Sequence, residues 1–192
     1  MLSAIDFAAV PNVTLAALPL PFLAPLRLQA NLKAKLKFGL FLYQGCAPGE
    51  ARPDSHGEIS ELAVADAEVV TAHWDHSDER SYIEARIEGG PSACIRSEAG
   101  DPMAWGLTHS EGAIGAVFTL ESARRQGFGE KVVRALTTRL LAKGQVPFCY
   151  IAEKNEASAH LFEKCGYVRQ PQPVFWALCQ GAAPPESESD SD

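Results

Sequence analysis

The sequence holds only five cysteines among its 192 residues, and no two of them stand at C-x-x-C spacing. Their number is odd, and Cys94, Cys149 and Cys179 lie in apolar runs, where cysteine usually acts as a small buried hydrophobe. This pattern disfavours both a disulfide framework and a zinc site. It predicts an intracellular, reduced chain that binds no metal.

The chain also lacks a long apolar run and an excess of positive charge. Residues 7–28 are apolar, but Pro11, Pro19, Pro21 and Pro25 interrupt them. No stretch of about 18–20 apolar residues is left to cross a membrane. The formal net charge is −7, whereas general binding to nucleic acid requires a basic surface. We therefore expect neither a membrane nor a nucleic acid as partner, and the oligomeric state is left open.

The two ends of the chain differ from its middle. Residues 1–49 carry four basic residues and a single acid, Asp6, whereas the last twelve residues carry four acids and no base. We interpret residues 1–57 as an irregular N-terminal extension, with a cleaved mitochondrial targeting segment as the alternative. Residues 181–192 are interpreted as a disordered acidic tail. The expected location is cytoplasmic, or mitochondrial under that alternative.

The middle of the chain, residues 58–180, has the alternation of an α/β domain. Apolar residues at helical spacing, with suitable ends, predict helices over 65–70, 80–87, 130–141 and 155–164. Apolar runs bounded by turn residues predict strands over 92–96, 102–108, 112–120, 146–152, 167–169 and 174–178. We expect the last two strands to form a hairpin around Pro171 and Pro173. The order of elements predicts a mixed sheet flanked by helices.

The segment Arg124-Arg125-Gln126-Gly127-Phe128-Gly129 lies between an apolar strand and a long amphipathic helix. The first N–H groups of a helix have no partner within it, and the helix dipole adds partial positive charge, so a phosphate fits there. The two glycines would let the backbone approach a ligand closely, and the two arginines would add charge and paired hydrogen bonds. The spacing is neither G-x-x-x-x-G-K-[ST] nor G-x-G-x-x-G, which disfavours a P-loop nucleotidase and a dinucleotide-binding fold.

Two motifs together resemble those of a known superfamily. Arg124-x-x-Gly127-x-Gly129 matches the [RQ]-x-x-G-x-[GA] loop of the GNAT acyltransferases. Residues 155–167, N-E-A-S-A-H-L-F-E-K-C-G-Y, resemble the N-x-x-[SA]-x-x-[LF]-[YF]-x-x-x-G-[FY] segment of the same superfamily. The segment at residues 98–105, E-A-G-D-P-M-A-W, is similar to a segment in the C-terminal domain of glycine N-acyltransferase-like proteins. The resemblance covers residues 58–180 and implies a GNAT-like mixed sheet whose central parallel strands splay apart.

The resemblance implies that the chain uses acetyl-CoA or another acyl-CoA as a co-substrate. The pyrophosphate would lie on the loop, and the pantetheine arm would pair with the preceding strand, in the splay between residues 113–120 and 146–152. The residues so implied to bind CoA are Val117, Phe118, Thr119, Leu120, Arg124, Arg125, Gln126, Gly127, Phe128, Gly129 and Asn155. A backbone N–H would stabilise the oxyanion while an amine attacks the thioester.

The expected proton acceptor departs from the family pattern. An ammonium group must lose a proton before it attacks, so a carboxylate or a histidine is expected near the splay. The acidic position of glycine acyltransferases falls on Ala113 here. Glu111, two residues earlier, is our candidate catalytic residue, with a solvated turn residue as the alternative interpretation. His109 is a weaker candidate.

Other polar and aromatic positions have more than one interpretation. The tyrosine that many GNAT enzymes use as an acid falls on Phe162, and Tyr150 and Tyr167 are either substitutes for it or core residues. Residues 73–76, H-W-D-H, have metal-like spacing without a supporting ligand cluster, so we interpret them as part of a surface helix.

The motifs favour an N-acyltransferase that moves an acyl group from CoA to a small amine or an amino acid. Protein N-acetylation is an alternative, because a net charge of −7 would attract basic peptides. A non-catalytic domain that binds CoA or a partner is a third possibility, which Ala113 and Phe162 motivate.

Overall fold

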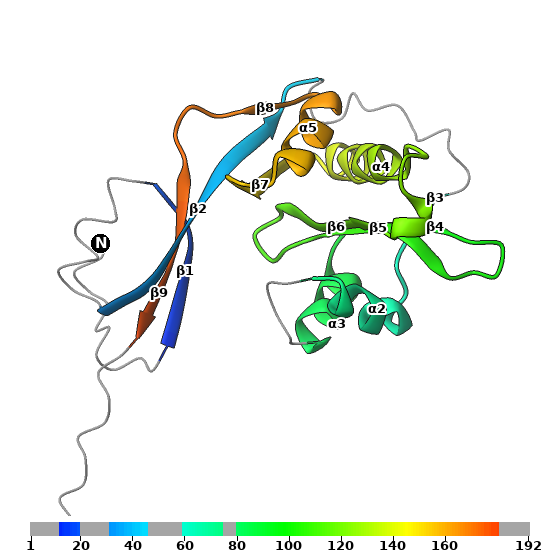
Figure 1. Cartoon of the computed structure of the whole chain (residues 1–192), viewed down its shortest axis with the longest axis horizontal. Coiled ribbons are helices and arrows are strands. Elements are labelled where there is room, and N and C mark those ends of the chain that lie inside the picture. Colours follow the sequence, from blue (N-terminus) through cyan, green and yellow to red (C-terminus); the bar gives the residue numbers. More distant parts are fainter. Residues whose placement is uncertain (1–11, 20–30, 46–58, 75–79, 181–192) are drawn as a thin grey trace, which may run out of the picture. The chain divides into compact units, whose positions relative to one another are not determined.

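A computed structural model of the chain describes residues 12–19, 31–45, 59–74 and 80–180 (Figure 1). The chain divides into two compact units, which we consider separately. One comprises Met1–Gly39 and Pro171–Asp192, and the other comprises Leu40–Gln170. Of the helices described, none is both long and apolar enough to cross a membrane.

The Leu40–Gln170 unit is built on a mixed sheet. Strands β3 (Ile59–Ser60), β4 (Ser92–Arg96), β5 (Pro102–Thr108) and β6 (Ile114–Thr119) pair antiparallel in that order. Strand β7 (Phe148–Ala152) is parallel to β6. The predicted mixed sheet is confirmed, and the bounds of β4 and β5 agree with the sequence prediction.

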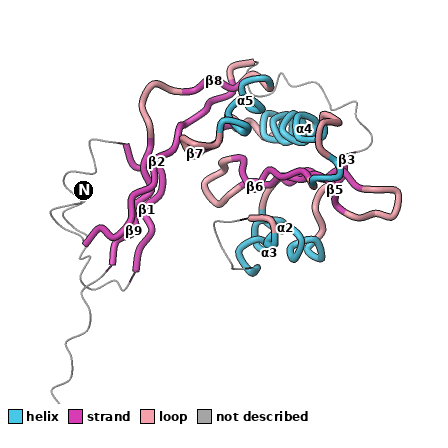
Figure 2. Tube along the Cα trace, in the orientation of Figure 1, coloured by secondary structure: helices cyan, strands magenta, loops and turns pink. Residues whose placement is uncertain are grey.

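Helices cover both faces of this sheet, as Figures 1 and 2 show. On one face lie the 3-10 turn η2 (Val64–Asp66) with helices α2 (Ala67–Ala72) and α3 (Arg80–Gly89). On the other lie α4 (Phe128–Ala142) and α5 (Glu156–Lys164). The buried stripe of α4 comprises Val132, Val133, Ala135, Leu136, Thr137, Leu140 and Leu141. Each large apolar side chain buried in this way contributes about 2 kcal/mol to folding.

The prediction that residues 1–57 are irregular is wrong at two places. Strand β1 (Asn12–Pro19) and strand β2 (Asn31–Tyr43) both pair antiparallel with β9 (Val174–Gln180). In β2, three lysines alternate with apolar residues over 32–38, which is the period of a strand. These bases therefore lie in a strand, and not in the amphipathic helix that the alternative of a targeting segment would require. Residues 1–11, 20–30 and 46–57 lie outside the described part of the chain.

The predicted hairpin of the last two strands is also wrong. Strand β8 (Tyr167–Arg169) pairs with Phe41–Tyr43 of β2, while β9 pairs with the earlier part of β2. Gln170 N–H still donates to Leu40 O at 2.8 Å. Pro171 and Pro173 follow, and because proline has no N–H, the ladder is interrupted there. The boundary between the two units falls at this point, within the segment predicted as a single domain over 58–180. The predicted acidic tail, 181–192, is not among the described residues.

Candidate functional site

The parallel strands at the centre of the sheet separate almost as soon as they meet. Strands β6 and β7 pair at one position, where Ile114 is opposite Cys149. Later residues of β6 have no register with β7 in the described structure, so that edge of β6 is not occupied by its neighbour. The splay predicted between these strands is therefore confirmed.

A β-bulge lies just after the point of separation. Leu107 is opposite Gly115 and Trp105 is opposite Phe118, so Ala116 and Val117 together face the single residue Gly106. Ala116 has a φ of +48°, a left-handed conformation that costs a non-glycine residue roughly 1 kcal/mol. A bulge redirects the backbone groups around it, and strain of this kind collects at functional sites. Nothing in the sequence marks Ala116, so sequence reasoning missed it.

The strand leads through the short turn η3 (Glu121–Ala123) into the predicted loop. Arg125 and Gly127 both have left-handed backbones, with φ of +63° and +76°. The first N–H with a helical partner in α4 is that of Lys131, which donates to Gly127 O at 3.1 Å. The earlier N–H groups of the helix therefore have no acceptor within it. Successive N–H groups in such a turn form a concave site for an anion.

The two glycines of the loop differ in what a larger side chain would meet at each position. Gly127 begins α4 in the left-handed region, and no heavy atom lies within 4 Å of a Cβ built there. Its constraint is therefore conformational, and the space above it is open. A Cβ at Gly129 would lie 3.4 Å from Leu161 Cδ2, an ordinary contact.

Positive charge dominates around the loop. Arg124 Nε donates to Thr119 O at 3.4 Å, and within the described residues Arg125 makes neither a hydrogen bond nor an ion pair. The one acid in the first turn of α4, Glu130, lies 2.7 Å from Lys164 Nζ and 2.9 Å from Arg134. Hydrogen bonds from Lys164 and then Arg134 lower the pKa of Glu130. Two cations thus offset this carboxylate, which leaves the field at the loop favourable to an anion.

Asn155 has a local role that explains its position. It precedes α5 as the N-cap, and its Oδ1 accepts a hydrogen bond from Ser158 N–H at 3.1 Å. Asparagine is among the preferred residues at this position. The side chain is exposed. Its contact with CoA stays a prediction.

The tyrosines differ in what they can do. Phe162 is buried and its ring lies 5.0 Å from that of Tyr167, whose hydroxyl is 2.7 Å from Thr137 Oγ1. Burial raises the pKa of Tyr167 far above its usual range, so it is a core residue. Tyr150 is half-buried on β7, and burial followed by the charge of Glu111 raises the pKa of its phenol.

The turn between β5 and β6 carries both predicted proton acceptors. Glu111 is exposed, and Ser110 Oγ donates to its Oε2 at 3.2 Å. His109 is half-buried, and its Nδ1 is 2.9 Å from the hydroxyl of Tyr82. Burial, then the charge of Glu111, raises the pKa of Tyr82. The structure therefore brings Glu111, His109, Tyr82 and Tyr150 to one region beside the splay.

The metal-like segment at 73–76 is only partly described. Helix α2 ends before His73, whose Nδ1 lies 2.9 Å from Val69 O and whose ring lies 4.7 Å from that of Phe118. Asp75 and His76 fall outside the described residues. Over the ranges that the structure covers, no three histidine, cysteine or acidic side chains gather as metal ligands.

Known proteins match this chain in sequence and in fold. A family model described as FR47-like protein matches residues 94–176, which include the bulge, the loop and α5. Human glycine N-acyltransferase-like protein 1 is 26% identical over 144 residues, which make up 73% of this chain and 48% of that protein. The chain thus spans about half the length of this curated relative.

Solved structures show the same fold. A Drosophila protein superposes with a TM-score of 0.73 at 20% identity, over 92% of this chain and 62% of that one. A GNAT-family protein from Novosphingobium aromaticivorans superposes with a TM-score of 0.66 at 16% identity, over 90% and 75% of the two chains. The chain therefore has the fold of the GNAT acyltransferases, and its sequence resembles that of the glycine N-acyltransferase-like proteins.

Proposed function

We propose that this protein is an acyl-CoA-dependent N-acyltransferase that moves an acyl group from CoA to the amine of a small molecule or an amino acid. One observation carries the proposal. The strand that bears the strained bulge at Ala116, where β6 and β7 part, leads directly into the left-handed turn at the start of α4. This continuity supports a thioester site and a pyrophosphate site on one segment of the chain.

The loop would bind the pyrophosphate through residues 124–129. No heavy atom lies within 4 Å of a Cβ built at Gly127, and among the described residues Arg125 has no hydrogen-bond or ion-pair partner that would compete for its guanidinium. Arginine binds phosphate oxygens through paired, charge-assisted hydrogen bonds. The anion would thus replace water at groups that the fold leaves without an acceptor.

The unpaired edge of β6 would bind the pantetheine arm. Leu120 N–H donates to Met103 O of β5 at 2.9 Å. Because N–H groups alternate in direction along a strand, those of Val117 and Thr119 are expected to face the opposite edge, toward β7. The amides of pantetheine can pair there as a short added strand.

Transfer would occur by direct attack. The amine nitrogen adds to the thioester carbonyl, the oxygen takes up negative charge, and the C–S bond then breaks to release the thiolate. A backbone N–H turned out of the ladder at the bulge would stabilise that oxygen. The acceptor ammonium must first lose a proton, and Glu111 remains a candidate for that step.

Calorimetry with acetyl-CoA and benzoyl-CoA tests the donor site. We expect binding of at least one, and its loss in the double variant Arg125→Glu/Gly127→Asp. The matched control is Lys143→Glu/Gly144→Asp at the other end of α4, where Gly144 is also left-handed with a φ of +73° and open surroundings. No binding of either compound to the wild type, or equal binding by both double variants, would contradict the proposal.

Thiol release tests the reaction. A panel pairing acetyl-CoA and benzoyl-CoA with amino acids, simple amines and basic peptides should give turnover with small acceptors. Turnover confined to peptides would instead favour protein N-acetylation. Binding without any turnover would favour a non-catalytic domain.

A further inference from the structure

The backbone of His109 is fixed by a closed turn at the start of the splay. Its N–H donates to Ala113 O, and Gly112 N–H donates to His109 O, both at 2.9 Å. The next residue after this turn is Ile114, the one position where β6 pairs with β7. His109 is therefore anchored where the two parallel strands begin to separate.

The imidazole lies over the first residue of the splayed part of β6. A Cβ built at Gly115 would collide with Nε2 of His109, so the ring occupies the space that a side chain at position 115 would fill. Gly115 adjoins Ala116, the left-handed residue of the bulge. Nε2 is thus placed one residue from the backbone that we assign to the thioester.

Side chains from α3 and from the residues just after α2 contact the rest of the His109 imidazole. Nδ1 is 2.9 Å from the Tyr82 hydroxyl, and the indole of Trp74 stacks on the imidazole with centroids 5.4 Å apart. When Nδ1 carries the hydrogen and donates it to the tyrosine oxygen, the lone pair is on Nε2, the nitrogen that lies against Gly115. Tyr82 would then hold the ring in the orientation that places Nε2 against Gly115.

The surroundings also suit the charge that proton uptake would create. The charges of Glu111 and Arg86 both act on Tyr82, that of Glu111 more strongly, and the Tyr82 oxygen can accept from Nδ1–H of an imidazolium. Histidine is the side chain that ordinarily exchanges protons near neutral pH, which suits the deprotonation of an ammonium. By contrast, Glu111 itself is exposed and is turned toward Ser110.

We propose that His109 is the catalytic residue that takes the proton from the acceptor amine, and that Tyr82 is its positioning residue. Nε2 accepts one proton from the ammonium, the freed lone pair forms the C–N bond at the thioester carbonyl, and the C–S bond then breaks. The proton that the new amide nitrogen sheds goes to the leaving sulfur, which gives CoASH, and the imidazolium returns its proton to solvent. This inference rests on the proposed acyl transfer.

The first test replaces the imidazole. With the donor and acceptor pair that turns over best in the thiol-release panel, His109→Ala should lower kcat about 100-fold or more, the usual scale of a lost general base. Calorimetric affinity for the same acyl-CoA should stay within about threefold, because the donor site is built from other residues. Added imidazole should restore part of the activity. His160→Ala, an exposed histidine on α5, is the control that should leave kcat unchanged.

Two further variants keep the histidine in the chain. Gly115→Ala places a methyl group where Nε2 lies, so it should displace the ring and lower kcat as strongly as His109→Ala does. Tyr82→Phe keeps the ring stack but removes the hydroxyl, and it should lower kcat about tenfold, the scale of one hydrogen bond.

Three results of these measurements would overturn the role proposed for His109. Wild-type turnover with a His109→Ala kcat within about threefold of it would overturn the role of His109 and leave acyl transfer standing. A large loss that imidazole does not restore, with Tyr82→Phe equal to wild type, would assign His109 to structure and also overturn it. A wild type that neither binds acyl-CoA nor turns over would overturn the proposed function, and the inference with it.

Discussion

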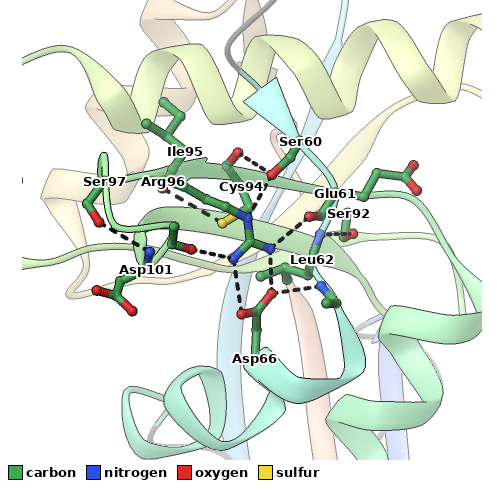
Figure 3. A network of polar contacts seen from close by, with 12 residues as sticks. Ser60, Glu61, Leu62, Asp66, Ser92, Cys94, Ile95, Arg96, Ser97 and Asp101 are labelled. Carbon is green, nitrogen blue, oxygen red and sulfur yellow. Dashed lines mark hydrogen bonds and ion pairs between the residues drawn. The ribbon is translucent and has the colours of Figure 1, made fainter.

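Two arginine sites in this fold use their hydrogen-bond donors in opposite ways. Arg96, at the end of β4, donates to Asp66 Oδ2 at 2.6 Å and Oδ1 at 3.2 Å. It also donates to Ser60 Oγ, Glu61 O and Gly100 O, each at 3.1 Å, as Figure 3 shows for most of these contacts. The guanidinium is therefore saturated by its own protein. It ties β3, η2 and the β4–β5 turn together.

The loop at residues 124–129 has donors without acceptors. Arg125 has no partner in the described part of the chain, and the N–H groups that begin α4 have none within the helix. Arg125 also has a strained backbone, with a φ of +63°. Composition alone therefore does not distinguish a structural arginine from one that is available to a ligand. The difference lies in whether the fold supplies the acceptors.

The largest loss of stability is expected when the guanidinium of Arg96 is removed. Arg96→Ala leaves Asp66, whose side chain is only 11% exposed, with Ala63 N–H as its remaining partner of those described. The free energy of unfolding, from urea titration, should fall by about 2–4 kcal/mol, because an unpaired carboxylate is left partly buried. Acyl-CoA affinity of the folded protein should not change.

A surface arginine provides the contrast for this variant. Arg80→Ala removes an exposed i,i+4 pair with Glu84 and should cost less than about 0.5 kcal/mol. If both variants unfold at the same urea concentration as wild type, Arg96 is not the structural anchor that its contacts indicate.

At the loop of residues 124–129, we expect a substitution to weaken ligand binding and to leave stability unchanged. Arg125→Ala should weaken acyl-CoA binding roughly tenfold in calorimetry, since one charge-assisted contact to phosphate is lost. Its free energy of unfolding should stay within about 0.5 kcal/mol of wild type, because the exposed side chain has no hydrogen bond or ion pair with the described residues. Lys143→Ala, exposed at the far end of α4, is the control. A stability loss without a change in affinity would place Arg125 with Arg96 as a structural residue.

What the sequence predicts well is decided locally. Gly127 precedes α4 with a left-handed backbone, and the apolar stripe of α4 has the helical period, so the turn and the helix after it were predicted, although the helix begins at Phe128 and not at Glu130. The N-cap at Asn155 follows from the same local chemistry. The turn and the helix start are therefore the parts of the candidate site that follow from local sequence, and anion binding there stays a prediction.

What the sequence misses depends on distant partners. Strand β1 pairs with β9, so that Asn12 is opposite Gln180, and no local pattern contains that partner. The bulge at Ala116 arises from the register between β5 and β6. Because alanine has no preference for a positive φ, the residue itself gives no signal of the bulge. The contact of His109 with Tyr82 joins residues that lie on separate elements. The proton acceptor that we propose rests on such contacts, so it could not be assigned from spacing alone.

The last prediction concerns how the stability that Asp66 contributes depends on pH. Burial by itself raises the pKa of Asp66, but hydrogen bonds from Arg96 and from Ala63 N–H outweigh it and hold that pKa below its ordinary value of 3.8. The ionised Asp66 therefore stabilises the fold fully above that value, and this contribution is lost as the pH falls through the lower folded-state pKa. Urea titrations of wild type and Asp66→Asn from pH 7 down to 3 should show a stability difference that shrinks at the acidic end, and that stays below the effect of Arg96→Ala throughout. A difference that is constant over this range would mean that the Arg96 site is held by its neutral contacts to Ser60, Glu61 and Gly100, and the charge of Asp66 would then have no part in closing it.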